Sequence, residues 1–354
     1  MMQNQIIERI DALQDYVSRI DFINYPEYTA EEVQEIIEKE LAQTKINYLT
    51  RIKEFQRDNL SSAHKGEKKF VVFWGYPGAG KSFMVNKLIQ RHQEQNPEII
   101  FNIIDKDQHR DLFGNLFEHL RGHVDECEKF GRPAMEYVRQ ILKLTLESGN
   151  KSVISIGAMG AGSEFCDNAQ IAIENGYKAQ AVYMCVNPDI AYLSNVYRSC
   201  TLYDKMIHQG QELYPRLVSR PYFDSVQKKL DGMILQIDAF QKQNPENVHL
   251  LVVNRANQTI YDAQQDNEQN ILGKIHYEEN RPFTAEELIL IHKQITMIDT
   301  NIRHRCEQRL YYPSQKEIDA MQMALVNIKH QVNRSKTANS MLFFSNSVGL
   351  EQVG

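Results

Sequence analysis

Short apolar runs alternate with longer helical patterns through the middle of the chain. The runs are rich in Val, Ile and Phe, and most are separated by stretches with helical spacing. Continuous apolar strands that alternate with helices are typical of a parallel sheet covered on both faces. The predicted strands are Phe70–Phe73, Ile99–Ile104, Val153–Ile156, Ala181–Val186 and Leu250–Val253. The pattern therefore predicts an α/β domain over residues 66–263.

Helical patterns flank this domain on both sides. Residues 1–60 include Thr29-Ala-Glu-Glu32, a capping box in which the Thr and Glu side chains satisfy free N–H groups of a first helical turn. Two more such signatures begin at Thr284 and Ser314, so residues 284–333 are expected to form a helical pair. Residues 335–354 are rich in Ser and Asn and are expected to form a loose tail.

Charge, hydropathy and cysteine usage narrow the class of protein. The formal net charge of -6 argues against a large nucleic-acid surface, because phosphate backbones recruit clustered Lys and Arg. No apolar run approaches the roughly 20 residues that span a bilayer, and the first residues lack the pattern of a signal peptide. The five cysteines contain no CxxC pair, which favours a reducing compartment. A cytoplasmic protein is expected.

A phosphate-binding motif follows the first predicted strand. The segment fits GxxxxGK[ST], with an apolar strand before it and a helical pattern after it. Glycines let backbone N–H groups wrap a phosphate, and the helix presents its positive end. Lys81 is expected to reach the β- and γ-phosphates, and Ser82 to bind Mg²⁺. The predicted nucleotide-binding residues are Gly75, Tyr76, Pro77, Gly78, Ala79, Gly80, Lys81 and Ser82. The expected nucleotide is ATP, with GTP as the alternative.

An acidic segment after the second predicted strand is the candidate acceptor site. Ligands in α/β sheets bind beyond the carboxyl ends of the strands, where Asp105 and Asp107 lie. An aspartate there can accept a proton from a hydroxyl or hold Mg²⁺. Asp107 is the first choice as the base and Asp105 the second. A helix N-cap is the structural alternative for either residue.

Further segments carry a resemblance to a known family. The chain contains, in order after the P-loop, IIDKDQHR, VYMCVNPDIAYLSNVYR, RLVSRPYFDSV and LLVVNRANQTIYD. This ordered set resembles the zeta toxin family of P-loop kinases over residues 66–263. The resemblance implies transfer of the γ-phosphoryl group of ATP to a sugar hydroxyl of UDP-N-acetylglucosamine and related UDP-amino sugars. It also implies a helical antitoxin partner that blocks the nucleotide site.

The resemblance also implies roles for single residues. Asp107 matches the catalytic base of the family. Arg198, after the fourth predicted strand, matches the first of two arginines that bind the nucleotide phosphates. Arg216 matches the second, with Arg220 as the alternative. Arginines spread over the γ-phosphoryl oxygens stabilise the charge of a loose transition state, which agrees with these roles.

The chain departs from the family at the end of the third predicted strand. The family has a glutamate there, followed by Gly and Thr, and the glutamate contacts the substrate. In this chain Ile156 stands at the glutamate position and Ala158 at the threonine position. The departure leaves the sugar-nucleotide substrate and catalysis itself open. Glu164, further along the chain, is a candidate replacement.

The remaining segments suggest two further roles. Residues 1–60 are expected to pack on the sheet or on residues 284–333, and the alternative is a built-in cover of the nucleotide site or a partner-binding module. The region from Leu112 to Gly131 is a candidate acceptor lid. A loose tail is compatible with export, so a secreted toxin or effector that acts in a target-cell cytosol fits the same sequence.

The sequence is also compatible with two functions other than that of a small-molecule kinase. A non-catalytic, nucleotide-switched binding protein is favoured by the missing glutamate and the large helical flanks. A polynucleotide kinase would need a basic, aromatic-lined groove near Asp107, and the acidic balance of the chain gives this little support.

Overall fold

The computed structural model divides the chain into two compact units, each built from segments that are distant in sequence. The first, here the helical unit, comprises Met1–Tyr25, Asn187–Leu217 and Tyr277–Gly354. The second, here the sheet unit, comprises Pro26–Val186 and Val218–His276. The structure describes residues 2–20, 67–95, 101–105, 138–149, 151–157, 162–209, 217–218, 220–266, 270–307 and 315–348, with single positions at 29, 31, 32, 35 and 38.

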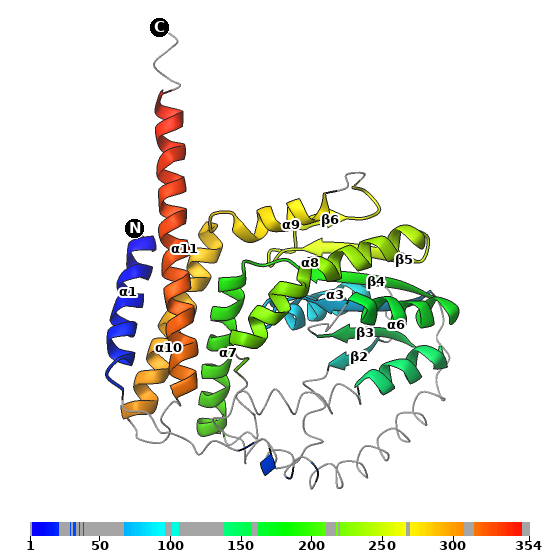
Figure 1. Ribbon diagram of the computed structural model, residues 1–354, viewed down its shortest axis with the longest axis horizontal. Helices are drawn as coiled ribbons and strands as arrows, with labels where there is room; N and C mark the ends of the chain where they lie inside the picture. Colours follow the sequence, from blue (N-terminus) through cyan, green and yellow to red (C-terminus); the bar gives the residue numbers. More distant parts are fainter. Residues whose placement is uncertain are drawn as a thin grey trace. The chain divides into compact units, whose positions relative to one another are not determined.

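The sheet unit is built on a mixed sheet of six mostly parallel strands (Figure 1). Its strands are β1 (Lys68–Trp74), β2 (Phe101–Asp105), β3 (Ser152–Ile156), β4 (Tyr177–Met184), β5 (Val248–Val253) and β6 (Thr259–Asp262). They lie in the order β2-β3-β1-β4-β5-β6, and β1 to β5 run parallel. The strand that precedes the phosphate-binding motif is therefore central, with its carboxyl end between those of β3 and β4.

The five parallel strands agree with the apolar runs of the sequence, and the sixth strand was missed. β6 is a short antiparallel edge strand that follows β5 through a turn at Asn254–Gln258. Asn257 adopts a left-handed conformation in this turn (φ 63°), a conformation that Asn tolerates better than most residues. β6 is only four residues long and partly exposed, so it lacks the apolar run that reveals a buried strand.

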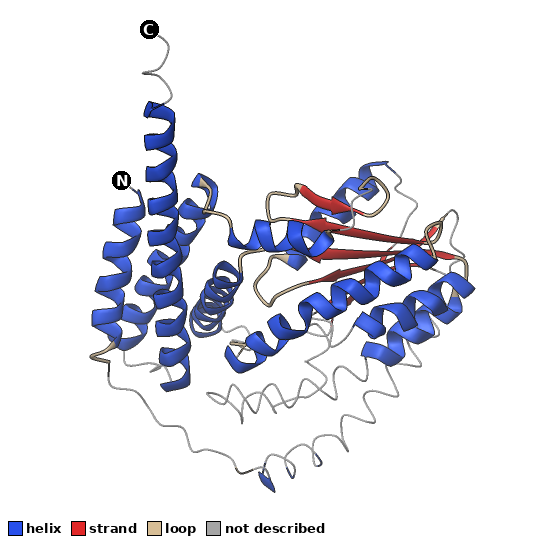
Figure 2. Ribbon diagram, turned by 45° about the horizontal axis from the view of Figure 1, so that its top comes forward, coloured by secondary structure: helices blue, strands red, loops and turns tan. Residues whose placement is uncertain are grey.

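Helices cover both faces of the sheet. α3 (Lys81–Gln95) packs against β1 and β3. α6 (Gly162–Glu174) and α8 (Arg220–Gln243) pack against each other and against β4 and β5, on the face that Figure 2 shows toward the viewer. The rings of Phe70 on β1 and Phe165 on α6 are stacked, with centroids 6.2 Å apart, which joins this helical layer to the sheet. α9 (Ile271–Asn280) follows β6 along the chain.

The helical unit is a bundle in which α1 (Met2–Val17) and α7 (Pro188–Gln209) each pack against α10 (Ala285–Glu307) and α11 (Gln315–Val348). The buried side chains recur every three or four residues, which places them on one face of each helix. They include Ile6, Ile10, Leu13 and Val17 of α1, Leu288, Ile291, Ile295, Ile298 and Ile302 of α10, and Ile318, Met321, Leu325, Ile328 and Val332 of α11. For residues 2–17, packing on the C-terminal helices is therefore what the structure shows.

Polar contacts fix how α7 lies against its neighbours in the bundle. Gln294 of α10 donates to the Ser194 hydroxyl at 2.8 Å, and both side chains are buried. Asn327 of α11 donates to the Asp189 carboxylate at 3.0 Å. Paired buried polar groups tolerate few alternative registers, because a shift leaves a donor or acceptor unsatisfied. The two C-terminal helices thus hold α7, the helix that follows β4.

Two of the three predicted capping boxes are present in full. Glu287 N donates to Thr284 Oγ1 at 3.2 Å, and Thr284 N donates to Glu287 Oε2 at 2.8 Å. Thr29 and Glu32 exchange the same two bonds, at 2.7 and 3.2 Å. The third box, at Ser314, lies outside the described residues. Of the predicted loose tail, residues 335–348 are helical, because no Gly or Pro interrupts α11 before Gly349.

Candidate functional site

The phosphate-binding motif forms a turn whose shape depends on glycine. Gly75, Gly78 and Gly80 all have positive φ angles, of 139°, 82° and 95°. Ala79 N donates to Tyr76 O at 3.1 Å, which closes a type II turn with Pro77 and Gly78 at its centre. These are the residue types that such a turn requires, so the local sequence dictates the loop.

Gly75 also allows β1 and β4 to approach each other at the start of the loop. A Cβ atom at this position would lie 2.9 Å from the carbonyl oxygen of Met184. Such a separation is shorter than real Cβ contacts allow, and the positive φ adds backbone strain. Glycine is therefore required here by the neighbouring strand as well as by the turn.

Helix α3 begins directly at the end of the loop. Met84 N donates to Gly80 O at 3.2 Å, so the backbone N–H groups that precede Met84 have no partner within the helix. The Ser82 side chain is exposed at this end. The positive end of the helix and the loop together make an anion site of the kind that binds phosphate.

The Lys81 ammonium is held beside the loop by backbone carbonyls. Lys81 Nζ donates to Gly75 O at 3.0 Å and to Tyr76 O at 2.9 Å. These bonds fix a positive charge next to the backbone amides of the turn. The predicted phosphate-binding residues are thus brought together in one place, and their chemistry fits a nucleotide phosphate.

Tyr76 has a different role from its neighbours in the loop. Its ring is buried and stacks on Phe223 of α8, with centroids 5.0 Å apart. The Arg220 guanidinium lies over the Phe223 ring, with its central carbon 5.6 Å from the ring centroid. Arg220 Nε also donates to Asp224 Oδ1 at 2.8 Å. Tyr76 therefore anchors the loop to α8.

Arg255 was not identified from the sequence, although it contacts the loop directly. Its Nε donates to Ala79 O at 3.3 Å, and its Nη2 donates to Gly78 O. The residue stands in the turn between β5 and β6. The available signal was the polar Asn254-Arg-Ala-Asn257 run directly after an apolar strand, which marks a turn at the carboxyl edge of the sheet.

On the acceptor side, the described residues include Asp105 but not Asp107. Asp105 is the last residue of β2 and lies beside Ile156, the last residue of β3. Gly157 N donates to Phe73 O at 3.1 Å, so the end of β3 adjoins the end of β1. Asp107, Ala158 and the predicted lid at 112–131 lie outside the described residues.

Ile156 occupies the strand end as the sequence predicted. It is 8% exposed and pairs in register with Phe73 on one side and Asp105 on the other. Glu164, the candidate replacement for the missing glutamate, lies in the first turn of α6 and accepts from Arg139 Nε at 3.2 Å. An arginine partner gives Glu164 a structural role of its own.

Of the two arginines predicted to bind phosphate, only Arg198 lies among the described residues. Arg198 lies on α7, as predicted, and belongs to the helical unit, where its Nη2 donates to Asn195 at 3.3 Å. Arg216 lies outside the described residues. Arg220, its alternative, opens α8 and belongs to the sheet unit.

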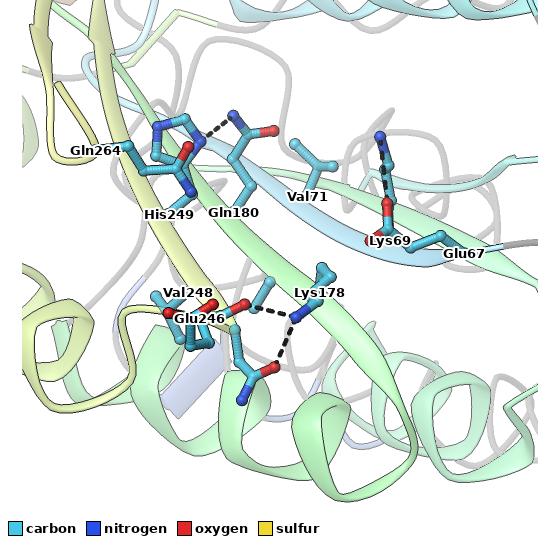
Figure 3. A pocket seen from close by; sticks show the side chains of 11 residues that line it. Glu67, Lys69, Val71, Lys178, Gln180, Glu246, Val248, His249 and Gln264 are labelled. Carbon is cyan, nitrogen blue, oxygen red and sulfur yellow. Dashed lines mark hydrogen bonds and ion pairs between the residues drawn. The ribbon is translucent and has the colours of Figure 1, made fainter.

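A hollow of about 340 Å³ lies at the opposite, amino-terminal edge of the sheet (Figure 3). Its lysines already have partners: Lys178 donates to Glu246 O and Asn247 Oδ1, and Lys69 lies 3.9 Å from Glu67. Figure 3 shows the Gln180 amide directed at His249, whose Nδ1 lies 3.1 Å away. This polar hollow is not part of the phosphate site.

No group of three or more His, Cys, Asp or Glu side chains suited to a metal ion occurs within the described part of the chain. Mg²⁺ at a P-loop is held by a hydroxyl and by substrate phosphates rather than by a cage of protein ligands. The exposed Ser82 hydroxyl fits that mode. Across the same described residues, none of the helices has the length and apolar character needed to cross a membrane.

The central parallel sheet and the loop that joins β1 to α3 define a P-loop, kinase-like protein. The zeta toxin family model matches residues 53–266, more than half of the chain. The chain belongs to the zeta toxin family, which confirms the resemblance seen in the sequence. No curated protein matches the chain significantly in sequence.

One of the similar solved structures supports the fold. A structure from the PezAT chromosomal toxin–antitoxin system of Streptococcus pneumoniae is 15% identical and covers 77% of this chain and 97% of its own, with a TM-score of 0.54. The AvrRxo1-ORF1:AvrRxo1-ORF2 complex with ATP is 11% identical and covers 86% of this chain and 96% of its own, with a TM-score of 0.43. At these identities the first likeness shows the fold alone.

Proposed function

We propose that this chain is a kinase that transfers the γ-phosphoryl group of ATP to a hydroxyl of a small molecule. The observation that carries the proposal is the geometry of the P-loop: three glycines with positive φ, a helix N-terminus and a positioned Lys81 meet at one end of β1. Catalysis of phosphoryl transfer consists mainly of positioning and charge stabilisation, and this loop supplies both.

The proposed transfer uses an aspartate at the acceptor edge of the sheet. The acceptor hydroxyl oxygen forms a bond to the γ-phosphorus, and the bond from that phosphorus to the β–γ bridging oxygen breaks. The hydroxyl proton passes to the carboxylate of Asp107, and the products are ADP and a phosphate monoester. Asp105, which ends β2, is the alternative base.

Lys81 and two arginines are proposed to hold the charge of the transferring group. Lys81 contacts the β- and γ-phosphates, and Arg198 and Arg216 contact the γ-phosphoryl oxygens, with Arg220 as the alternative to Arg216. The family resemblance supports the two arginine roles. The Ser82 hydroxyl would hold Mg²⁺ together with the nucleotide phosphates, and the ion would supply neutralisation of the phosphate charge.

The proposed acceptor is a UDP-amino sugar such as UDP-N-acetylglucosamine. Family membership supports this class of substrate. Ile156, in place of the family's glutamate, removes a carboxylate that would accept hydrogen bonds from sugar hydroxyls. We therefore expect the carboxyl end of β3 to make fewer hydrogen bonds to the acceptor in this chain than in family members that have the glutamate.

Incubation of the protein with γ-labelled ATP, Mg²⁺ and a panel of UDP-sugars and small metabolites tests the proposal. Label transferred to one compound, and lost in both Lys81→Ala and Asp107→Ala, identifies the enzyme and its substrate. Transfer that persists in Asp107→Ala and stops in Asp105→Ala would assign the base to Asp105. Absence of transfer to every acceptor, with ATP binding retained, would overturn the kinase.

A second candidate function is a nucleotide-switched binding protein without catalysis. The specific observation that favours it is the buried Ile156 at the strand end where the family has a glutamate. In this case, nucleotide binding requires Lys81 and is independent of Asp107. Nucleotide-dependent capture of a partner, with no label transfer, distinguishes the switch from the kinase.

The proposed partner is an antitoxin-like protein, and the proposed role is that of a toxin or effector. The PezAT relative comes from a toxin–antitoxin system. The proposed site of action is the cytoplasm, or a target-cell cytosol after secretion. Co-expression of this chain with its genomic neighbours, scored by rescue of growth, tests the partner and the toxicity together.

A further inference from the structure

Arg255 makes its two contacts in the glycine-rich Gly78–Gly80 segment of the P-loop. Gly78 and Gly80 have φ angles of 82° and 95°, and a Cβ at Gly80 would meet nothing within 4 Å. Glycines occupy positive and negative φ with similar ease, so a peptide plane between them can rotate at low cost. The glycines that allow the loop to form therefore also allow conformations in which its backbone N–H groups point in other directions.

The direction of the Ala79 carbonyl determines the direction of the next amide. A trans peptide unit is planar, and its C=O and N–H groups point to opposite sides. Arg255 Nε donates to Ala79 O at 3.3 Å, which fixes the Ala79–Gly80 peptide with the Gly80 N–H directed away from the guanidinium. The second bond, from Nη2 to Gly78 O, restrains the preceding peptide as well.

Arg255 itself is held by a hydrogen-bonded turn. Asn254 Oδ1 accepts from Ala256 N and from Gln258 N, each at 3.0 Å, and Asn254 N donates to Gln258 O at 3.0 Å. The turn joins two paired strands, so it is anchored at both ends. The guanidinium is therefore presented to the loop by a fixed scaffold.

We propose that Arg255 is a positioning residue of the P-loop: by binding the carbonyls of Gly78 and Ala79, it keeps the Gly80 amide turned toward the bound phosphate. This inference rests on the proposed nucleotide site and adds a residue to it. Arg255 acts through the loop rather than on the transferring group. Its loss is expected to weaken the binding of anything that carries a diphosphate, whatever base is attached.

Calorimetric titration of the full chain with pyrophosphate and with ADP tests the inference. The variants are Arg255→Met, which removes the donors, and Arg255→Lys, which restores a cation that can reach one carbonyl. The matched control is Arg91→Met, an exposed arginine on α3. Arg255→Met is expected to lower the affinity for both pyrophosphate and ADP by about 10-fold, the equivalent of roughly 1.4 kcal/mol. Arg255→Lys should recover part of the loss, and Arg91→Met should bind as the unchanged chain does.

The melting temperature without ligand separates positioning from simple stability. It should fall by less than a few degrees in Arg255→Met, because the loop is small. A lower affinity for ADP with an unchanged affinity for pyrophosphate would mean that Arg255 contacts the base, and this result would overturn the inference. Unchanged affinity for both ligands also overturns it, and leaves the proposed kinase intact. If the unchanged chain binds neither ligand, the nucleotide site itself is refuted and the inference falls with it.

Discussion

Lys81 Nζ lies 2.9 Å from the carbonyl oxygen of Tyr76, the residue whose ring is stacked on Phe223. The contact ties the only long cation of the motif to its buried anchor. A side chain with four rotatable bonds is costly to fix, so a lysine that is already restrained loses less entropy when a phosphate arrives. The loop is thus prepared for its ligand before binding.

Lys81→Met should weaken ADP binding by roughly 10- to 100-fold, the scale of hydrogen bonds to charged groups. The methionine keeps the length of the side chain and removes the charge. Lys87→Met is the control, because Lys87 lies on the same helix and its ammonium rests over the exposed Phe83 ring. Calorimetric titration measures both. Equal affinities of the two variants would refute the role of Lys81.

Gly75→Ala should destabilise the sheet unit and Gly157→Ala should not. A methyl group at Gly75 meets Met184 O at 2.9 Å and imposes a strained φ, at a cost of about 1–3 kcal/mol. Gly157 directly follows the neighbouring strand β3, and a Cβ there meets nothing within 4 Å. Urea unfolding of the two variants compares the positions directly. Similar midpoints for both would show that β4 can move away.

Ile10→Ala should destabilise the helical unit by about 2–5 kcal/mol, because Ile10 is fully buried between α1 and its partners. Glu8→Ala, two residues earlier on the exposed side of α1, is the control. The free energy of unfolding from urea titration, followed by circular dichroism, gives both values. If Ile10→Ala unfolds like Glu8→Ala, α1 is not a stable part of the bundle.

The parallel core of the fold was predictable because its signals are local. The buried strands are continuous apolar runs, and the capping boxes at Thr29 and Thr284 form the bonds that their spacing requires. β6 was missed because a short edge strand carries no such run. The packing of α7 with α10 and α11 was also not predictable, since it depends on contacts such as that between Gln294 and Ser194, which are 100 residues apart in the sequence.

The same contrast holds for the candidate site. The P-loop could be predicted because the local backbone requires the residue types found there, as the positive φ of Gly78 requires glycine. Arg255 was not, since its partner carbonyls lie more than 170 residues earlier in the chain. A side chain that binds backbone carbonyls leaves no complementary residue type in the sequence. Ile156 stands at the strand end that the resemblance indicated, because the apolar run that forms β3 ends there.

Asp266 and Lys274 should give the sheet unit a pH-dependent contribution to stability. Asp266 Oδ1 lies 2.6 Å from Lys274 Nζ, and Asp266 also accepts from Asp262 N at 2.8 Å. The hydrogen bond from Lys274, followed by that from the Asp262 amide, lowers the pKa of Asp266. Because the folded-state pKa is depressed, the contribution is complete above the unfolded value of about 3.9 and is lost as pH falls through the folded value.

Asp266→Asn should therefore be less stable than the unchanged chain near neutral pH and equally stable in strong acid. Both side chains are more than a quarter exposed, so the difference should not exceed about 1 kcal/mol. Urea unfolding at a series of pH values from about 7 down to about 2, where the carboxylate is protonated in both states, measures it. Asp167→Asn, at an exposed position of α6, is the control and should show no such convergence. A difference that stays constant down to the lowest pH would mean that the charge of Asp266 contributes nothing to stability.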